Sequence, residues 1–219
     1  IHEGNIFFAL KGEKFNANEF AAEAFKKGAA YVVVDELINE TWKKQFGEQL
    51  IVVANVLKTL QQLSGYHRKQ LRCPVLAITG SNGKSTTTKL TYHILKQSGY
   101  DAALVGNIGY SFAKQIAEQP AQWYVMEISS FQLDDIQSFR PDIAVLLNIT
   151  PDHLDRYPSV ESYYETKRRI FYLLNPGGIS IPPLEKGGLG GFLPCPKLLG
   201  THNLQNMRAA ILAAQALGV

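Results

Sequence analysis

The feature that most restricts the fold is a buried strand that leads through a glycine-rich turn into a helix. Val75–Thr79 is largely apolar and shows no alternation, which is typical of a strand covered on both faces. Gly80–Lys84 is the expected turn, and Ser85–Gln97 is the expected helix, closed by Gly99. A strand that continues directly into a helix begins a crossover unit, so this part of the chain predicts a parallel sheet.

The same alternation of apolar strands and helices continues downstream. Because both faces of such a sheet must be covered, the pattern predicts an α/β fold with a doubly wound, P-loop-type parallel sheet. The further strands are expected at Ala102–Val105, Trp123–Ile128 and Ile143–Asn148, and the further helices at Ser111–Glu118, Ser159–Leu174 and Asn203–Leu217.

Residues 1–70 predict a separate, smaller α/β domain, which leaves residues 71–219 for the larger one. Strands are expected there at Asn5–Leu10, Tyr31–Val34 and Leu50–Ala54, and helices at Glu19–Lys27, Asn39–Phe46 and Leu57–Gln70.

One segment and both ends of the chain depart from this regular pattern. Residues 176–197 are rich in proline and glycine, so we expect an irregular segment there. Ile1 is not an initiator residue, and the last expected helix runs almost to Val219. We therefore expect a segment before Ile1 and a further domain after Val219.

Composition excludes several other classes of protein. Hydrophobic residues make up 46% of the 219 residues and charged residues 19%, which suits a packed core and not a disordered chain. The net charge of +3 is too small for a nucleic-acid or anionic-membrane footprint. Cys73 and Cys195 indicate neither a disulfide framework nor a zinc site. No apolar run approaches the ~20 residues of a membrane span, so we expect a cytoplasmic protein.

The strongest chemical signal is the segment Gly80-Ser-Asn-Gly-Lys-Ser-Thr86 between strand and helix. Backbone N–H groups of such a turn can point at an anion on the helix N-terminus. Lys84 can reach the outer phosphates of a nucleotide, and the Ser85 hydroxyl can bind Mg²⁺. Ile78 stands where the general P-loop pattern has its first glycine, so only a shorter form of the motif is present. An ordinary strand-to-helix turn is the alternative.

Two further candidates follow the ends of expected strands. Glu127 ends the strand Trp123–Ile128, where ligands gather in open α/β sheets, and could hold a divalent cation. An ion pair with a lysine is the alternative. His153 follows the next strand, between Asp152 and Asp155. It could serve a metal or a phosphate, or it could be an ordinary loop residue.

Three other candidates have a plain structural explanation. Lys167 precedes two arginines on an expected helix, so by composition it belongs to a basic solvated face. Asn203 and Asn206 lie at the start of the last helix, where asparagine normally caps. The residues alone therefore predict a Mg²⁺-dependent nucleotide-binding α/β protein and leave the acceptor of the phosphate open.

Taken together, these motifs resemble those of the Mur ligase family, the ATP-dependent amide-forming enzymes that extend the peptide of peptidoglycan precursors. The glycine segment resembles the short phosphate loop of that family. Four further segments are similar to those of its D-glutamate-adding branch, and the resemblance covers about residues 74–174 and 198–219. These segments are Gly106–Gly109, Glu127–Leu133, Asn148–Tyr157 and Thr201–Asn206.

The resemblance implies ATP and Mg²⁺ as cofactors and gives each candidate a role. ATP would be bound by Gly80, Ser81, Asn82, Gly83, Lys84, Ser85, Thr86, Asn203 and Asn206. Mg²⁺ would be held by Ser85, Glu127, His153 and a carbamate on Lys167, and the catalytic set would be Lys84, Glu127, His153 and Lys167. Asn107 and Ser129 would contact the substrate. The implied reaction forms an acyl phosphate on a carboxylate of the UDP-N-acetylmuramoyl peptide, which the amine of D-glutamate then attacks.

The first 70 residues resemble a different branch of the same family. Gly4–Gly12, Phe15–Phe20 and Gly28–Asp35 are similar to the N-terminal uridine-nucleotide domain of the D-alanyl-D-alanine-adding branch, or of the branch that acts before it. The two resemblances together imply a mosaic of two branches. A D-alanyl-D-alanine-adding ligase and a truncated, non-catalytic nucleotide-binding module are the alternatives to D-glutamate addition.

The resemblance also sets expectations for activity and partners. The third domain of the family has no counterpart before Val219, so this chain alone is expected to bind nucleotide weakly and to turn over poorly. We expect small-molecule partners only, a UDP-N-acetylmuramoyl peptide and a D-amino acid, and a monomer.

Overall fold

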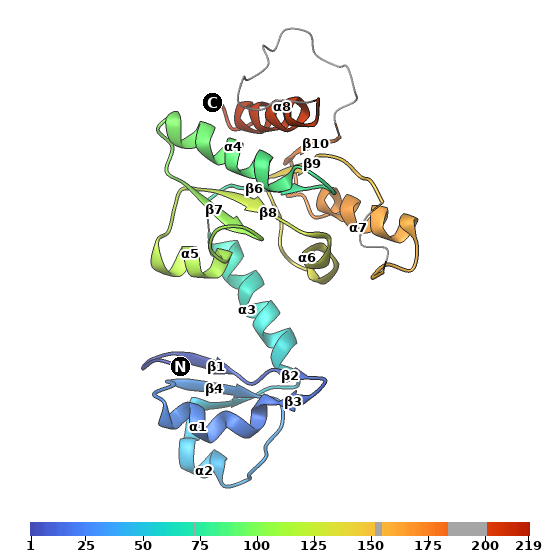
Figure 1. Ribbon diagram of the computed structural model, residues 1–219. Helices are drawn as coiled ribbons and strands as arrows, with labels where there is room; N and C mark the ends of the chain where they lie inside the picture. Colours follow the sequence, from blue (N-terminus) through green and yellow to red (C-terminus); the bar gives the residue numbers. More distant parts are fainter. Residues whose placement is uncertain (72, 152–154, 184–200) are drawn as a thin grey trace. The chain divides into compact units, whose positions relative to one another are not determined.

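The computed structural model describes residues 1–71, 73–151, 155–183 and 201–219 (Figure 1). The chain divides into two compact units, Ile1–Leu71 (unit 1) and Arg72–Val219 (unit 2). No helix among the described residues is long and apolar enough to cross a membrane.

Unit 1 is built on a small parallel sheet. Its strands are β1 (Ile6–Phe8), β4 (Tyr31–Val34) and β5 (Leu50–Val52), in the order β1-β4-β5. One face of the sheet packs on helices through a cluster of valines, leucine and alanines. The helical segments are η1 (Ala17–Phe20), α1 (Ala21–Lys26), α2 (Trp42–Phe46) and η2 (Gly47–Gln49), and β2 (Lys11–Gly12) pairs with β3 (Phe15–Asn16).

The last helix of unit 1, α3 (Val56–Gln70), is anchored at its first turn by side chains. Asn55 caps the helix by accepting from Lys58 N, and the Asp35 carboxylate accepts from Val56 N at 3.1 Å. Asp35 also accepts from the amide of Asn18, which is fully buried. The hydrogen bond from Val56 N–H is the main cause that lowers the pKa of Asp35, so the carboxylate is stabilised at the positive end of α3.

Unit 2 contains a five-stranded sheet in the order β10-β9-β6-β8-β7, with every adjacent pair parallel. The strands are β6 (Val75–Thr79), β7 (Ala102–Gly106), β8 (Trp123–Glu127), β9 (Ile143–Leu146) and β10 (Ile179–Ile181). β6 lies in the middle and is buried at every position, which explains why four of its five residues, Val75–Ile78, are apolar.

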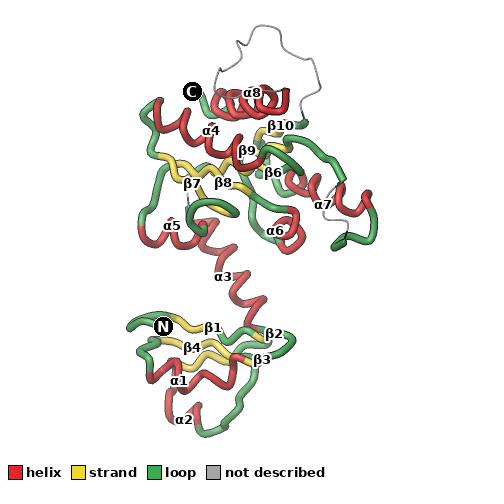
Figure 2. Tube along the Cα trace, in the orientation of Figure 1, coloured by secondary structure: helices red, strands yellow, loops and turns green. Residues whose placement is uncertain are grey.

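Helices cover both faces of this sheet (Figure 2). Leu76 and Ile78 of β6 pack on one side with α4 (Lys84–Gln97) and α8 (Thr201–Gln215). Val75 and Ala77 pack on the other side, which is covered by α5 (Phe112–Glu118), α6 (Ser130–Asp135) and α7 (Val160–Tyr172). The predicted α/β fold with a doubly wound parallel sheet is therefore confirmed.

The elements that the sequence pattern does not predict are short. α6 has six residues and depends on a capping box in which Ser129 and Gln132 exchange hydrogen bonds. β10 lies in the proline- and glycine-rich segment, for which the sequence predicts only irregular chain. That prediction is wrong for Ile179–Ile181, because pairing with β9 compensates for the weak local preference.

Candidate functional site

The glycine loop between β6 and α4 has the shape that a phosphate-binding turn requires. Gly83 precedes the first residue of α4 with a φ of +80°, a conformation that side chains rarely adopt. A Cβ at this position would also lie 2.7 Å from Cγ of Asn206, which α8 holds against the loop with 6% exposure. Glycine is thus required by the backbone and by the close approach of Asn206.

Lys84 folds back over the loop. Its Nζ donates to the carbonyl oxygens of Gly80 and Ser81, each at 2.9 Å. The ammonium group therefore lies above the glycine loop at the N-terminus of α4. A cation in this place adds to the positive end of the helix and favours a bound anion.

Glu127 is buried beneath the exposed polar residues of the site. The side chain is 1% exposed, Oε2 accepts from Ser85 Oγ at 2.8 Å, and Oε1 accepts from Asn107 Nδ2 at 2.9 Å. Ser85 and Asn107 are both exposed, so the carboxylate lies beneath two polar groups that open to solvent. Gly106, with φ +101°, lets the chain pass against the Glu127 carbonyl and so brings Asn107 into reach.

The Ser85–Glu127 pair fits a magnesium ion. A hydroxyl and a carboxylate are hard oxygen donors, and two ligands at 2.0–2.1 Å at right angles are separated by roughly 2.9 Å. The observed separation of 2.8 Å between Ser85 Oγ and Glu127 Oε2 is close to that value. The two donors to the Glu127 carboxylate described above, the Ser85 hydroxyl and the Asn107 amide, are both neutral.

Lys167 points inward, unlike its neighbours. It is 2% exposed, and its Nζ donates to Gly80 O at 2.9 Å and lies 5.2 Å from the ring centre of Tyr163. Arg168, by contrast, is about half exposed and pairs with Glu165. The solvated basic face expected from composition is therefore wrong for Lys167 itself. The carbonyl oxygen of Gly80 thus accepts from two lysines, one from α4 and one from α7.

The residues on either side of the loop hold it in place. Ser81 Oγ lies 2.9 Å from Thr150 O, accepts from Thr150 N at 2.9 Å and contacts Tyr163 Oη at 3.0 Å. Asn82 and Asn148 exchange hydrogen bonds between backbone and side chain. The sequence motifs alone did not single out Asn148, Thr150 or Tyr163. Asn148 follows an apolar strand just as Glu127 ends one, and that signal could have identified it.

The remaining predicted site residues lie as follows. Asn206 reaches the glycine loop, and Asn203 lies one helical turn earlier on α8 and is half-buried. Ser129 caps α6, and the prediction that it contacts substrate stays a prediction. His153 and its neighbour Asp152 lie outside the described residues.

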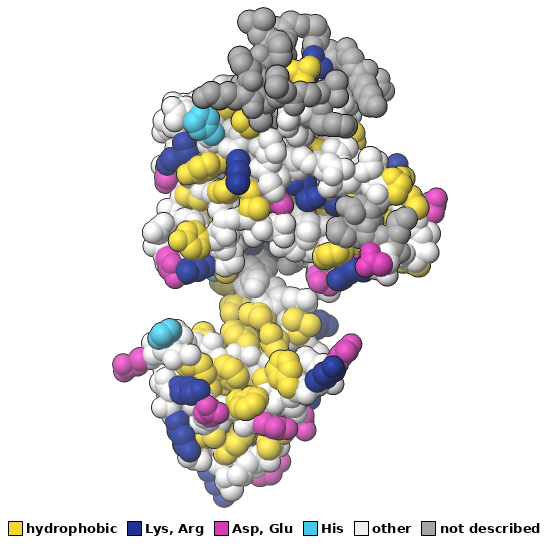
Figure 3. All heavy atoms as spheres, viewed as in Figure 1, with side chains coloured by type: hydrophobic (Ala, Val, Ile, Leu, Met, Phe, Trp, Pro, Cys, Tyr) yellow, Lys and Arg dark blue, Asp and Glu magenta, His cyan; other side chains and the backbone are white. Residues whose placement is uncertain are grey.

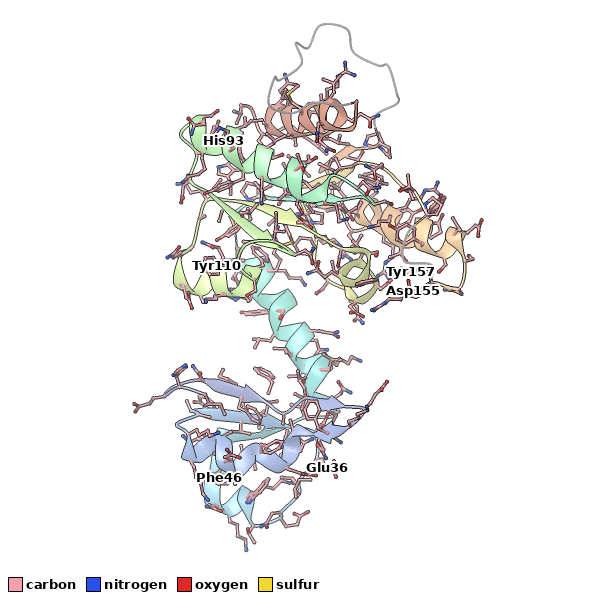
Figure 4. All side chains as sticks on the ribbon, viewed as in Figure 1. Glu36, Phe46, His93, Tyr110, Asp155 and Tyr157 are labelled. Carbon is pink, nitrogen blue, oxygen red and sulfur yellow. The ribbon has the colours of Figure 1, made fainter. Side chains whose placement is uncertain are left out.

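The segment that leads into α7 is tied to its neighbours. Figure 4 labels Asp155, which is exposed, and Tyr157, which is buried. Tyr157 Oη donates to Asp134 Oδ2 at 2.7 Å, and Thr166 donates to the other carboxylate oxygen at 2.8 Å. Burial is the main cause that raises the pKa of Tyr157, so it acts as a neutral donor.

Unit 1 carries a separate cavity of about 410 Å³. Hydrophobic side chains gather on the visible face of this unit (Figure 3). The cavity is lined by Ile1, Phe7, Phe15, Ala17, Phe20, Glu23, Ala24 and Lys27. The lining is mostly apolar and includes three phenylalanines, Phe7, Phe15 and Phe20.

Comparison with known proteins relates the middle of the chain to one family. The protein family described as Mur ligase middle domain matches this chain over residues 78–187. The UDP-N-acetylmuramoylalanine–D-glutamate ligase of Cytophaga hutchinsonii is 61% identical over 102 residues, which are 46% of this chain and 23% of that protein. The enzyme of the same name from Bacteroides fragilis is 58% identical over 97 residues, 44% of this chain and 22% of its own length. The alignments thus span about a quarter of these relatives.

Solved structures of another branch match over the whole chain. MurF ligase from Thermotoga maritima in complex with ADP has a TM-score of 0.82 at 21% identity, over 100% of this chain and 61% of that one. MurF from Acinetobacter baumannii has a TM-score of 0.75 at 26% identity, over 100% of this chain and 58% of that one. Since the family model covers residues 78–187, which contain the glycine loop, Glu127 and Lys167, the chain belongs to the Mur ligase middle domain family.

Proposed function

We propose that this chain forms the acceptor-binding and ATP-binding parts of an ATP-dependent amide-forming ligase that adds D-glutamate to UDP-N-acetylmuramoyl-L-alanine. The observation that carries the proposal is the 61% identity to a ligase of that name, over 102 residues of this chain. The family match over residues 78–187 includes the loop, the buried glutamate and the buried lysine of the site.

The residues of unit 2 supply what phosphoryl transfer needs, which is positioning and charge neutralisation. The backbone at the N-terminus of α4 and the Lys84 ammonium bind the phosphates of ATP. Ser85 and Glu127 hold Mg²⁺, which offsets the phosphate charge when it is bound. Asn107 fixes the orientation of the Glu127 carboxylate through the 2.9 Å hydrogen bond to Oε1.

The reaction proceeds in two transfers. A carboxylate oxygen of the acceptor attacks the γ-phosphorus of ATP, and the bond to the β–γ bridging oxygen breaks to release ADP. The amine of D-glutamate then attacks the carbonyl carbon of the acyl phosphate, phosphate leaves, and the amine loses a proton. Residues of this chain contribute to the first transfer through Lys84 and the inward-facing Lys167.

Lys167 serves this site as a carbamate. In its amine form it competes with Lys84 for the same carbonyl oxygen, and two ammonium groups so close repel each other. Reaction of the neutral amine with CO₂ would replace one cation by an anion that can face Mg²⁺. Added bicarbonate should then restore activity lost at low pH, and short carboxylic acids should partly restore Lys167→Ala. Arg168→Ala, on the exposed side of α7, is the matched control. It keeps Lys167, so bicarbonate should act on it as on the unmodified chain, and it should gain nothing from short carboxylic acids.

The alternative is addition of D-alanyl-D-alanine. It is favoured by one observation, the match of MurF structures over 100% of this chain, unit 1 included. The aromatic lining of the unit 1 cavity suits a uracil ring of either acceptor, because phenylalanine rings stack on flat heterocycles. Unit 1 therefore supports a UDP-linked acceptor without deciding its peptide.

The deciding experiment titrates the purified chain with UDP-N-acetylmuramoyl-L-alanine and with the UDP-N-acetylmuramoyl tripeptide. Phosphate release with Mg-ATP is then measured with D-glutamate and with D-alanyl-D-alanine. Preference for the first acceptor and donor supports the proposal, and preference for the second supports the alternative.

Lys84→Ala tests whether the glycine loop carries the activity. It should weaken Mg-ATP binding and abolish any turnover, whereas Lys89→Ala, on the exposed side of the same helix, should leave both unchanged. Absence of Mg-ATP binding by the unmodified chain would refute the proposed function. Nucleotide binding without binding of either acceptor would leave a non-catalytic nucleotide-binding module.

A further inference from the structure

The glycine loop is hydrogen-bonded to the segment that follows β9. Ser81 N donates to Asn148 O at 3.0 Å, and Asn82 N donates to Asn148 Oδ1 at 2.8 Å. The Asn148 amide returns a hydrogen bond, from Nδ2 to Asn82 O at 2.9 Å. One residue therefore accepts from two consecutive loop N–H groups and donates to a loop carbonyl.

These contacts divide the loop into two parts. The N–H groups of Ser81 and Asn82 are used within the protein and are not free to bind a phosphate. The N–H groups that remain for an anion are those at the first turn of α4, which lack partners inside a helix. The first turn of α4, Gly83–Thr86, thus keeps N–H groups that can receive a phosphate, while the N–H groups of Ser81 and Asn82 hold the loop to Asn148.

The support that Asn148 gives to the loop is specific in its chemistry. The side-chain amide of Asn148 presents an acceptor and a donor in the same arrangement as a neighbouring backbone, so it extends the pairing of β6 and β9 past the point where the strands end. Asn82 is exposed and Asn148 is half-buried. Water can replace these hydrogen bonds if the amide is removed, so the fold should survive while the loop loses its fixed shape.

We propose that Asn148 is a positioning residue that holds the glycine loop in its nucleotide-binding shape. This inference rests on the proposed function only for the identity of the ligand. A loop held in one shape by these hydrogen bonds loses less conformational entropy when phosphates bind, and this preorganisation strengthens the affinity.

The test compares Asn148→Ala with Asn175→Ala in the full chain. Asn175 is a matched control, because its amide also makes side-chain hydrogen bonds, to Asp142 and Arg140, at the other end of β9. Dissociation constants for Mg-ATP and for Mg-pyrophosphate are measured by titration calorimetry. Exchange of the Asn82 amide proton is measured by NMR without ligand.

The expected result is a loss of about tenfold in affinity for both ligands in Asn148→Ala, equal to about 1.4 kcal/mol, and no loss in Asn175→Ala. The Asn82 amide should exchange faster in Asn148→Ala alone, and this readout needs no nucleotide. Unchanged exchange and unchanged affinity in Asn148→Ala would overturn the inference, as would equal losses in both variants. If the unmodified chain binds neither ligand, the proposed function fails, whereas the exchange result still decides whether Asn148 orders the loop.

Discussion

Replacement of Gly83 by alanine should destabilise unit 2 for two separate reasons. The first is the backbone, because φ at this position is +80°. The second is space, because the added Cβ would lie 2.7 Å from Cγ and 2.8 Å from Nδ2 of Asn206. Asn206 is 6% exposed on α8, so its amide must turn away within packed surroundings.

The structure offers a control for the first cause. Gly177 has φ +79°, and no heavy atom lies within 4 Å of the place that an added Cβ would take, so Gly177→Ala should carry only the conformational strain of about 1–2 kcal/mol. Forcing a side chain into an occupied space costs a further 1–3 kcal/mol or so. We therefore expect the free energy of unfolding to fall by roughly 2–5 kcal/mol in Gly83→Ala.

Urea unfolding followed by tryptophan fluorescence measures both variants. The chain has two tryptophans, and Trp42 lies in unit 1, so a Trp42→Phe background leaves Trp123 of β8 as the reporter of unit 2. Adding Asn206→Ala to Gly83→Ala should restore most of the stability that the clash removes. Adding it to Gly177→Ala should restore none, because that variant loses stability through backbone strain alone. Equal losses in the two glycine variants, or a double variant that is simply additive, would refute the close approach of α8 to the loop.

Three further predictions concern other parts of the molecule. Glu127→Gln should weaken nucleotide binding tenfold or more in the presence of Mg²⁺ and leave it nearly unchanged in EDTA. The reason is that the variant keeps the size of the side chain but loses the anionic ligand. Equal affinity of the variant and the unmodified chain in Mg²⁺ would contradict the metal site. Tyr157→Phe should lower the free energy of unfolding of unit 2 by about 1 kcal/mol in urea, since it removes the 2.7 Å hydrogen bond to Asp134. Asp35 has a pKa lowered from its ordinary value of 3.8, so the stability that its carboxylate gives to unit 1 is present above that value and is lost as the pH falls through the lower folded-state pKa. Urea unfolding of unit 1, read from Trp42 in a Trp123→Phe background, should show this loss, and an identical loss when Asp35→Asn is added would argue against it.

The fold could be predicted from the sequence where a strand is buried on both faces. Val75–Thr79 and Tyr31–Val34 form strands with the bounds expected from their apolar runs. The short elements could not be predicted, because tertiary contacts outweigh local preference in them. Ile179–Ile181 becomes a strand only through its pairing with β9.

Several residues of the candidate site could be predicted from the sequence, because they lie at or just after the ends of strands. Glu127 and Ser85 were expected to share a cation, and the structure brings their oxygens to 2.8 Å. Lys167 could not be assigned an inward orientation from composition, because three consecutive basic residues must point in different directions on a helix and the sequence does not say which one is buried. Asn148 was missed because its role depends on which strand lies beside β6.

That strand order explains why the site exists at this edge of the sheet. From β6 the chain first runs to β7 and β8 on one side and then crosses to β9 on the other, so the loops after β6, β8 and β9 leave from adjacent strands. The register pairs Ile78 with Glu127 and Thr79 with Leu146, so Glu127 and Asn148 reach the glycine loop from opposite sides. A carboxylate on one side can hold a cation for the phosphates, while an amide on the other holds the loop. The apolar pattern of the sequence would be satisfied equally well by other strand orders, so the position of the site follows from the order in which the strands pair.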